Sequence, residues 1–190
     1  MADGPLIVGL GGSAGPASAS GALLHESLGL LAVAGARTVA FDGERLAALP
    51  IFSVHDYVAG EVGDELVDAA RQADALVIAT PGYHGGMSGL VKNAIDHLEL
   101  LRDDAPPYLD GRAVGVIVAT AGWQSCGTAL VAVRSAVHAL RGWPTPFGLT
   151  VNTAEQELTD QKVVGGLEIV VAQLLEFTRW RAAAARETVR

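Results

Sequence analysis

Residues 80–97 read TPGYHGGMSGLVKNAIDH, and this stretch decides the fold. The apolar run Ala75–Ala79 precedes it without polar alternation, which is typical of a parallel strand buried on both faces. Pro81 offers no N–H to a strand ladder and is expected to end the strand, while Ser88 is placed to cap the helix that follows. Apolar residues recur along that helix at helical spacing: Leu90, Val91, Ala94, Ile95 and Leu98. A glycine-rich loop at the carboxyl end of a buried strand is where open α/β sheets bind ligands.

The pattern Thr-Pro-x-Tyr-x-Gly-x-x-x-Gly-x-x-Lys-Asn-x-x-Asp over residues 80–96 resembles the signature of the NADPH-dependent FMN reductase family. The resemblance implies a flavodoxin-like α/β fold, a three-layer sandwich that holds FMN. It also implies that the flavin ring lies along Thr80, Pro81, Gly82, Tyr83, His84 and Gly85. The family usually has an acidic residue where this chain has Gly82, and often Asn where it has His84.

A second glycine-rich loop follows the first predicted strand, Leu6–Leu10, and leads into a helix. Such a loop is a ready anion site, because backbone N–H groups and the helix dipole both favour a phosphate. The family resemblance implies that Ser13, Ser18, Ala19 and Ser20 hold the FMN phosphate. The family's Arg and Asn are Gly15 and Ser20 here, so we expect FMN to bind loosely and to be usable as a substrate.

The same loop is open to other interpretations. Gly9-x-Gly11-x-x-Ala14 fits the dinucleotide-binding fingerprint, with Asp42 closing the second strand as a ribose-binding acid would. A Walker loop is excluded, since no Gly-Lys-Ser/Thr follows. A plain turn without a ligand is the third interpretation.

A third loop follows the apolar run Arg112–Thr120. The resemblance implies that it closes over the flavin pyrimidine through Thr120, Ala121, Gly122 and Trp123. Trp123 departs from the family pattern. Its indole is expected either to cover the flavin ring or to pack against a neighbouring subunit.

Two further strands are predicted at Arg37–Phe41 and Phe147–Val151, and a long final helix from about Asp160. Alternating strands and helices predict one flavodoxin-like FMN-binding domain over residues 1–190, with a five-stranded parallel sheet in the order 2-1-3-4-5. This order brings the three loops to one switch point. Between the second and third strands, His55, Asp56 and Tyr57 are expected at a solvated loop tip, with Leu46, Leu49, Ile51 and Phe52 tucked against the body.

Composition narrows the class of protein. A net charge of -8 over 190 residues argues against nucleic acid as a partner. No apolar run is long enough to span a bilayer, and no basic segment precedes the first strand as in a signal peptide. The single cysteine, Cys126, fits a reducing compartment and is expected to be a buried apolar residue, so a cytoplasmic location is predicted.

The predicted chemistry needs few side chains. The five histidines are scattered and Cys126 has no second thiol, so no metal site is predicted. Hydride passes directly from nicotinamide to flavin, and therefore no catalytic acid or base is assigned.

The resemblance implies an NAD(P)H-dependent FMN reductase that passes electrons to a small acceptor such as free flavin, a quinone, an azo compound or a metal oxyanion. It also implies a homodimer or homotetramer with the flavin near an interface, and a flavin-dependent monooxygenase as a partner for reduced flavin. The alternatives are a flavodoxin-type electron carrier, a Rossmann NAD(P)-binding protein, and a flavodoxin-like protein that has lost cofactor affinity.

Overall fold

The computed structural model describes residues 4–15, 17–57 and 60–188. The main strands of the sheet are separated by helices, as predicted, with short additional elements between some of them. In order they are β1 (Leu6–Gly11), α1 (Ala19–Val33), β2 (Arg37–Phe41), α2 (Gly43–Ala47), α3 (Glu61–Gln72), β3 (Ala75–Tyr83), β4 (Gly86–Met87), α4 (Gly89–His97), the 3-10 helix η1 (Leu98–Leu101), β5 (Ala113–Thr120), α5 (Trp123–Ala139), β6 (Trp143–Pro144), β7 (Leu149–Asn152) and α6 (Gln161–Thr188).

The sheet is parallel in its main body and runs in the order β2-β1-β3-β5, with β6 and β7 both beside β5. β6 pairs with the start of β5 and β7 with its end, so two short strands share the fifth position. The predicted order 2-1-3-4-5 is therefore confirmed. The fifth predicted strand is shifted, because Leu149–Asn152 pairs with β5 whereas Phe147 precedes the strand.

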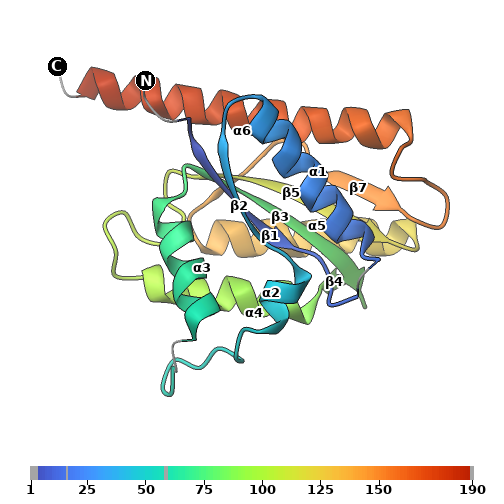
Figure 1. Ribbon diagram of the computed structural model, residues 1–190, viewed down its shortest axis with the longest axis horizontal. Coiled ribbons are helices and arrows are strands. Elements are labelled where there is room, and N and C mark those ends of the chain that lie inside the picture. Colours follow the sequence, from blue (N-terminus) through green and yellow to red (C-terminus); the bar gives the residue numbers. More distant parts are fainter. Residues whose placement is uncertain (1–3, 16, 58–59, 189–190) are drawn as a thin grey trace.

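Two hydrophobic cores lie on opposite faces of the sheet and make it the middle layer of a sandwich. Side chains alternate between the cores along each central strand, as in β5, where Val114, Val116 and Val118 face one core and Ile117 faces the other. The first core packs against α3, α4 and α5, and the second against α1 and α6. Figure 1 shows α6 and α1 together on one side of the sheet and α2, α3 and α4 on the other.

Pro81 does not end its strand, contrary to the prediction. β3 continues to Tyr83 and turns back into β4 as a hairpin. The carbonyl of Ala79 accepts the N–H of Gly12 at 3.0 Å, so Ala79 and, two residues later, Pro81 direct their backbone groups toward the β1 side. β1 has already ended at Gly11, and Pro81 therefore loses no ladder bond there.

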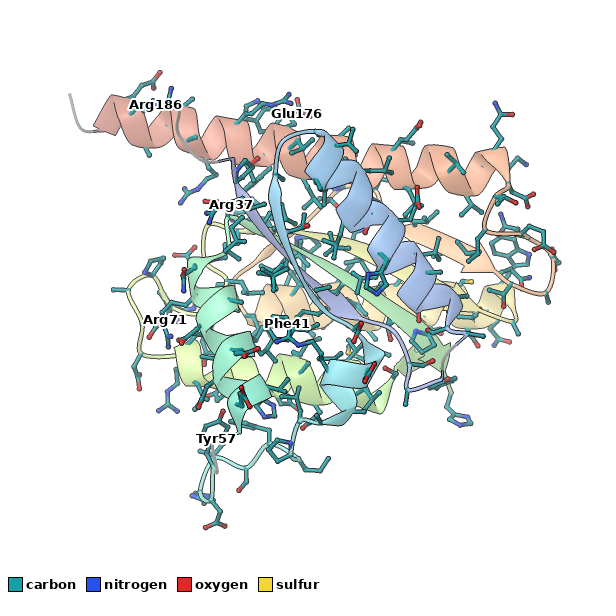
Figure 2. The ribbon with its side chains drawn as sticks, in the orientation of Figure 1. Arg37, Phe41, Tyr57, Arg71, Glu176 and Arg186 are labelled. Atoms are coloured by element: carbon teal, nitrogen blue, oxygen red, sulfur yellow. The ribbon has the colours of Figure 1, made fainter. Side chains whose placement is uncertain are left out.

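The loop before α3 is held more firmly than predicted. Asn93 accepts the N–H of Phe52 at 2.9 Å and donates to the carbonyl of Pro50 at 2.8 Å. The Tyr57 ring packs against Phe52 and against the buried His97, with ring centroids 5.9 and 5.8 Å apart. Figure 2 shows Tyr57 below α3. The prediction of a solvated tip was wrong for Tyr57, because its ring finds an aromatic neighbour on α4.

Other predictions about burial are mostly confirmed. His55 and Asp56 are exposed, Leu46 and Leu49 are buried, and Cys126 is buried. Ile51 is exposed rather than tucked in. None of the helices in the described part of the chain is long and apolar enough to cross a membrane.

Candidate functional site

The first loop runs from the end of β1 to the start of α1 and is organised by Ser18. The Ser18 Oγ accepts the N–H groups of Ser13 and Gly21, each at 3.1 Å, and lies 3.1 Å from the Oγ of Ser20. Ser18 is thus the N-cap of α1, whose first turn carries no acidic residue. The helix therefore presents its positive end to the loop, as an anion site requires.

A cavity of about 770 Å³ lies beside this loop. It is lined by the loop and the start of α1, by Asp42, Gly43 and Glu44, and by Leu158. The loop touches the start of α2, since a Cβ added to Gly43 would lie 1.9 Å from the Ser13 carbonyl oxygen. None of the described lining residues is Lys or Arg.

The second loop is the tight hairpin between β3 and β4. Its two central residues, His84 and Gly85, have φ of 51° and 83°, as a type I′ turn demands. His is among the residues that tolerate this conformation, which explains how it stands where the family often has Asn. Tyr83, immediately before the turn, is 54% exposed and presents its ring at the surface.

Thr80 supports this hairpin from below. Its side chain is fully buried, and its hydroxyl donates to the carbonyl of Pro81 at 2.9 Å and accepts the N–H of Ser88 at 3.0 Å. Ser88 in turn caps α4, as predicted, by accepting the N–H of Val91. The hydroxyl of Thr80 is therefore committed to the hairpin, and a bound ring would meet the backbone around it.

Gly82 fixes the hairpin against the third loop. A Cβ added there would lie 2.4 Å from the Thr120 Cγ2 and 3.3 Å from the Ala129 Cβ. An acidic residue, which the family usually has at this position, would not fit without movement of β5 or α5. Close packing around Gly82 thus explains why this chain has glycine where the family usually has an acidic residue.

The third loop joins β5 to α5 and is stiffened by Thr120. The Thr120 hydroxyl accepts the N–H of Gly122 at 3.1 Å and donates to its carbonyl at 2.7 Å. Trp123 begins α5, is 49% exposed, and donates its indole N–H to Glu155 at 2.9 Å. Sequence reasoning missed Glu155. The only signal was that its loop leaves a strand at the same edge of the sheet.

The three loops meet at the carboxyl edge of the sheet. Gly12 of the first loop bonds to Ala79 at the base of the hairpin, and Gly82 of the hairpin packs on Thr120 of the third loop. The loops predicted to form one site, which carry Ser13 and residues 18–20, 80–85 and 120–123, are thus brought to one edge of the sheet. The contact of each residue with a cofactor stays a prediction.

The donor set fits a flavin phosphate held by neutral groups. Backbone N–H groups at the start of α1 and the Ser13 and Ser18 hydroxyls are the donors that the first loop supplies, and Ser20 is buried behind them. No group of three or more His, Cys, Asp or Glu side chains among the described residues could hold a metal ion.

A parallel sheet in this order, with its three loops together at the carboxyl edge, defines a flavodoxin-like fold. The structure is similar to that of FerB, described as a flavoenzyme NAD(P)H:(acceptor) oxidoreductase from Paracoccus denitrificans, with a TM-score of 0.76 over 93% of this chain and 98% of the other. The two sequences are 19% identical, and the likeness therefore shows the fold alone. The model of the NADPH-dependent FMN reductase family matches residues 5–156. The chain belongs to this family of oxidoreductases, which uses FMN and NAD(P)H.

Two curated relatives of this chain are named as flavin-dependent reductases. An NAD(P)H-dependent FMN reductase of Pseudomonas aeruginosa is 30% identical over 124 residues, which are 64% of this chain and 63% of that protein. An FMN-dependent NADPH-azoreductase of Staphylococcus aureus is 33% identical over 91 residues, 48% of this chain and 45% of the relative. The chain thus spans less than two thirds of the length of either relative.

Proposed function

We propose that this protein is a single-domain reductase that transfers hydride from NAD(P)H to a flavin and passes the electrons to a small acceptor. The observation that carries the proposal is the hairpin 80–87, whose family signature sits beside the phosphate-type loop at the same edge of the sheet. Each loop contributes backbone groups rather than a charged side chain. This is the arrangement that hydride transfer between two bound rings needs.

In this proposal the flavin supplies the redox chemistry, and the protein supplies position and polarity. Ser13, Ser18 and Ala19 hold the phosphate with Ser20 behind them, as the N–H groups and hydroxyls of the loop indicate. The hairpin from Pro81 to Gly85 supports the ring, while Tyr83 borders the face on which a nicotinamide stacks. Ala121, Gly122 and Trp123 close the far edge. No acid or base is assigned, because hydride transfer requires none.

The acceptor, the partners and the location are proposed by analogy. The relatives' names support an acceptor such as free flavin or an azo compound. A homodimer or homotetramer, a cytoplasmic location and delivery of reduced flavin to a monooxygenase complete the proposal. The absence of a cationic lining residue in the described cavity supports loosely bound FMN.

The visible absorption spectrum tests this function. FMN is added to the purified protein under anaerobic conditions, followed by NADPH or NADH. We expect the flavin band to bleach, and the faster nucleotide identifies the donor. Flavin that binds but stays oxidised would indicate an electron carrier instead, and absence of flavin binding would refute the assignment.

A further inference from the structure

A second cavity, of about 520 Å³, lies at the amino edge of the sheet. Its walls come from the chain just before β1, β3 and β5 and from the second half of α6. In Figure 1, α6 passes over the point where the chain enters β1. This cavity shares no lining residue with the cavity beside the first loop, so it is separate from the candidate flavin site.

Arginines outnumber carboxylates in the lining of this cavity. Arg112, Arg179 and Arg181 stand against Asp74 and Asp110, and the formal charge of the lining is therefore +1 (three less two). The whole chain carries -8, so the cavity is locally opposite in sign to the protein. Among the described residues, neither Arg179 nor Arg181 bonds to a carboxylate.

The Arg112 guanidinium is fixed in place and still has donors to offer. Three of its five N–H groups donate to backbone carbonyls, and one N–H remains on each terminal nitrogen. Asp74, by contrast, already uses its Oδ2 to accept the N–H of Leu6 at 2.8 Å. The cation in this wall is thus available to a ligand, while one of the two carboxylates is partly engaged.

The Arg181 guanidinium lies close to Arg112. A Cβ added to Gly111 would lie 2.5 Å from the Arg181 Nη2, so the bare backbone next to Arg112 makes room for this group. Burial, in the first place, lowers the pKa of Arg112, and the charge of Arg181 acts in the same direction against the nearby carboxylates. An anion held by both guanidinium groups would receive hydrogen bonds from each and reduce their repulsion.

Much of the remaining lining is apolar. It includes Pro5, Ala34, Pro106, Leu175 and Ala182. A wall of this kind covers the hydrocarbon part of a ligand, while a few charged groups fix its orientation. The lining charge of +1 matches one negative charge, and the planar guanidinium fork matches the two oxygens of a carboxylate.

We propose that this cavity is a binding site for a monocarboxylate with an apolar body, whose carboxylate is held by Arg112 and Arg181. The site is distinct from the flavin loops and does not depend on the proposed function. The ligand class includes small aromatic acids and medium-chain aliphatic acids, which share this chemistry.

Titration calorimetry of the full chain with benzoate and octanoate, at constant ionic strength, tests the site. We expect at least one of the two to bind, and to raise the unfolding temperature because it binds the folded chain. A bound benzoate should bind at least about tenfold more tightly than benzamide, which lacks the charge. Terephthalate should bind more weakly than benzoate, because its second carboxylate would face the apolar wall. Octanol is the neutral counterpart of octanoate.

Arg181→Gln is the decisive variant, since this exposed side chain makes no bond that holds the fold. It should weaken binding of the carboxylate about tenfold and leave FMN binding unchanged. Arg186→Gln is the matched control, because Arg186 is exposed on the same helix and does not line the cavity. It should change the affinity by less than about twofold.

Four outcomes would overturn the proposal. The first is that neither carboxylate binds, and the second is that the neutral counterpart binds equally well. The third is an equal loss in the two arginine variants, which would mean that only the general charge of α6 matters. The fourth is competition between the carboxylate and FMN, which would place the probe at the carboxyl edge. Each of these leaves the proposed reductase function standing, whereas failure of FMN to bind refutes that function and leaves this site untouched.

Discussion

The two edges of the sheet use polar groups in opposite ways. At the carboxyl edge, the Ser18 hydroxyl accepts the Ser13 N–H and the Thr120 hydroxyl accepts the Gly122 N–H, and the described cavity there has no cationic lining residue. At the amino edge, Arg112 donates to the carbonyls of Ala73, Tyr108 and Arg71 at 2.8, 3.0 and 2.7 Å. The Arg112 guanidinium at the amino edge thus bonds to internal carbonyls, whereas no cationic side chain lines the described cavity at the carboxyl edge.

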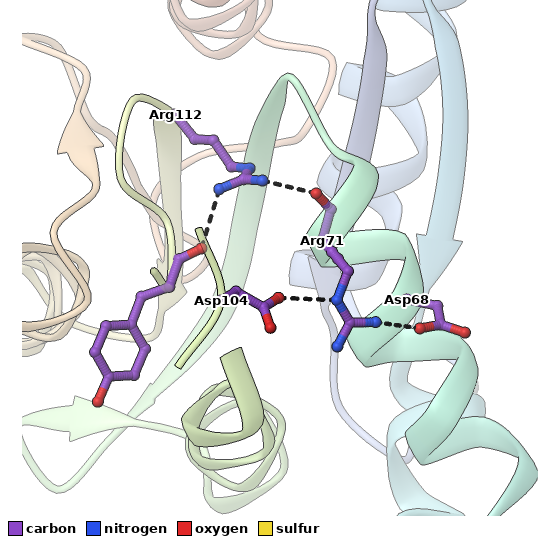
Figure 3. A network of polar contacts seen from close by, with 5 residues as sticks. Asp68, Arg71, Asp104 and Arg112 are labelled. Atoms are coloured by element: carbon purple, nitrogen blue, oxygen red, sulfur yellow. Dashed lines mark hydrogen bonds and ion pairs between the residues drawn. The ribbon is translucent and has the colours of Figure 1, made fainter. Parts of the chain in front are cut away.

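Figure 3 shows how the amino edge is connected: Arg112 reaches the backbone of Arg71, whose own side chain contacts Asp104 and Asp68. Burial lowers the pKa of the Arg112 guanidinium, and the hydrogen bond to Asp104 raises the pKa of Arg71. An arginine stays charged in either direction at ordinary pH. This edge therefore acts as a permanent clamp on the loop before β5.

The largest effect is expected from breaking that clamp. Arg112→Met leaves three carbonyls without their donor, and we expect the free energy of unfolding to fall by about 3 kcal/mol. Flavin affinity should be unchanged, because the site is at the other edge. Urea denaturation and flavin titration of the folded variant check the two statements.

Arg186→Met, on the exposed last turns of α6, is the control and should change stability by less than about 0.5 kcal/mol. Arg112→Lys keeps the charge without the planar fork and should fall between the two. If the folded Arg112→Met protein bound flavin less tightly, the independence of the two edges would be disproved.

The second effect concerns the carboxyl edge itself. A methyl group at Gly82 meets Thr120, so Gly82→Ala should cost about 1–3 kcal/mol of stability and displace the hairpin. We expect flavin affinity to fall at least about tenfold, equivalent to about 1.4 kcal/mol, as titration would show.

Gly165→Ala in α6 is the matched control, because a Cβ there meets nothing within 4 Å. It should stabilise the helix by about 0.5–1 kcal/mol. Unchanged flavin binding in Gly82→Ala would exclude the hairpin as the ring support.

Both edges show what the sequence could and could not predict. The buried strands at Leu6, Ala75 and Arg112 were located to within a few residues, because a run of apolar residues is a local signal. The strands β4 and β6 were missed, since two residues carry no period. The continuation of β3 past Pro81 depends on where β1 ends, which no local pattern records.

The candidate site also has features that the sequence predicted and others that only the fold reveals. Its glycine loops follow from short motifs, and the structure brings them together. The contacts Trp123–Glu155 and His25–Asp42 join residues 32 and 17 positions apart (155 less 123, 42 less 25), and therefore only the fold reveals them. Arg112 was read as the start of a strand, and its bonds to carbonyls 39 and 41 positions away lay equally beyond the motifs.

A third test compares a polar group that is paired with one that is not. The Tyr57 hydroxyl is buried without a hydrogen-bond partner among the described residues, whereas the Tyr108 hydroxyl donates to Glu99 at 3.1 Å. Tyr57→Phe should therefore stabilise the protein by about 0.5–1 kcal/mol, and Tyr108→Phe should destabilise it by about 0.5 kcal/mol. Thermal or urea unfolding at neutral pH measures both. The same sign for the two variants would contradict this account of the Tyr57 hydroxyl.

The stability of the protein at alkaline pH depends on the same buried Tyr57 hydroxyl. Burial, and then the Asp64 carboxylate, raise the pKa of Tyr57 above its usual value. Because the folded state holds the proton more tightly, the stability from this group is complete below about pH 10 and is lost as the pH rises toward the folded pKa. Tyr57→Phe should flatten the fall of stability above about pH 10. An unchanged alkaline profile would refute the contribution of this hydroxyl.

The smallest effect is expected at the outer rim of the carboxyl edge. Glu155 joins two parts of the site, since one oxygen accepts the Trp123 indole N–H at 2.9 Å and the other accepts the Asn152 amide at 2.9 Å. Glu155→Ala frees the indole, and an exposed bond of this kind is worth about 0.5–1 kcal/mol, so flavin affinity should fall about two- to fivefold. Glu155→Gln keeps one acceptor oxygen, which can accept the indole N–H or the Asn152 amide but not both, and it should lose less. Glu157→Ala removes the same charge two residues away and serves as the control.

Flavin titration, with tryptophan fluorescence to report the indole's surroundings, measures the series. Equal losses in Glu155→Ala and Glu157→Ala would mean that charge alone matters, and that Trp123 does not need to be held in order to cover the flavin.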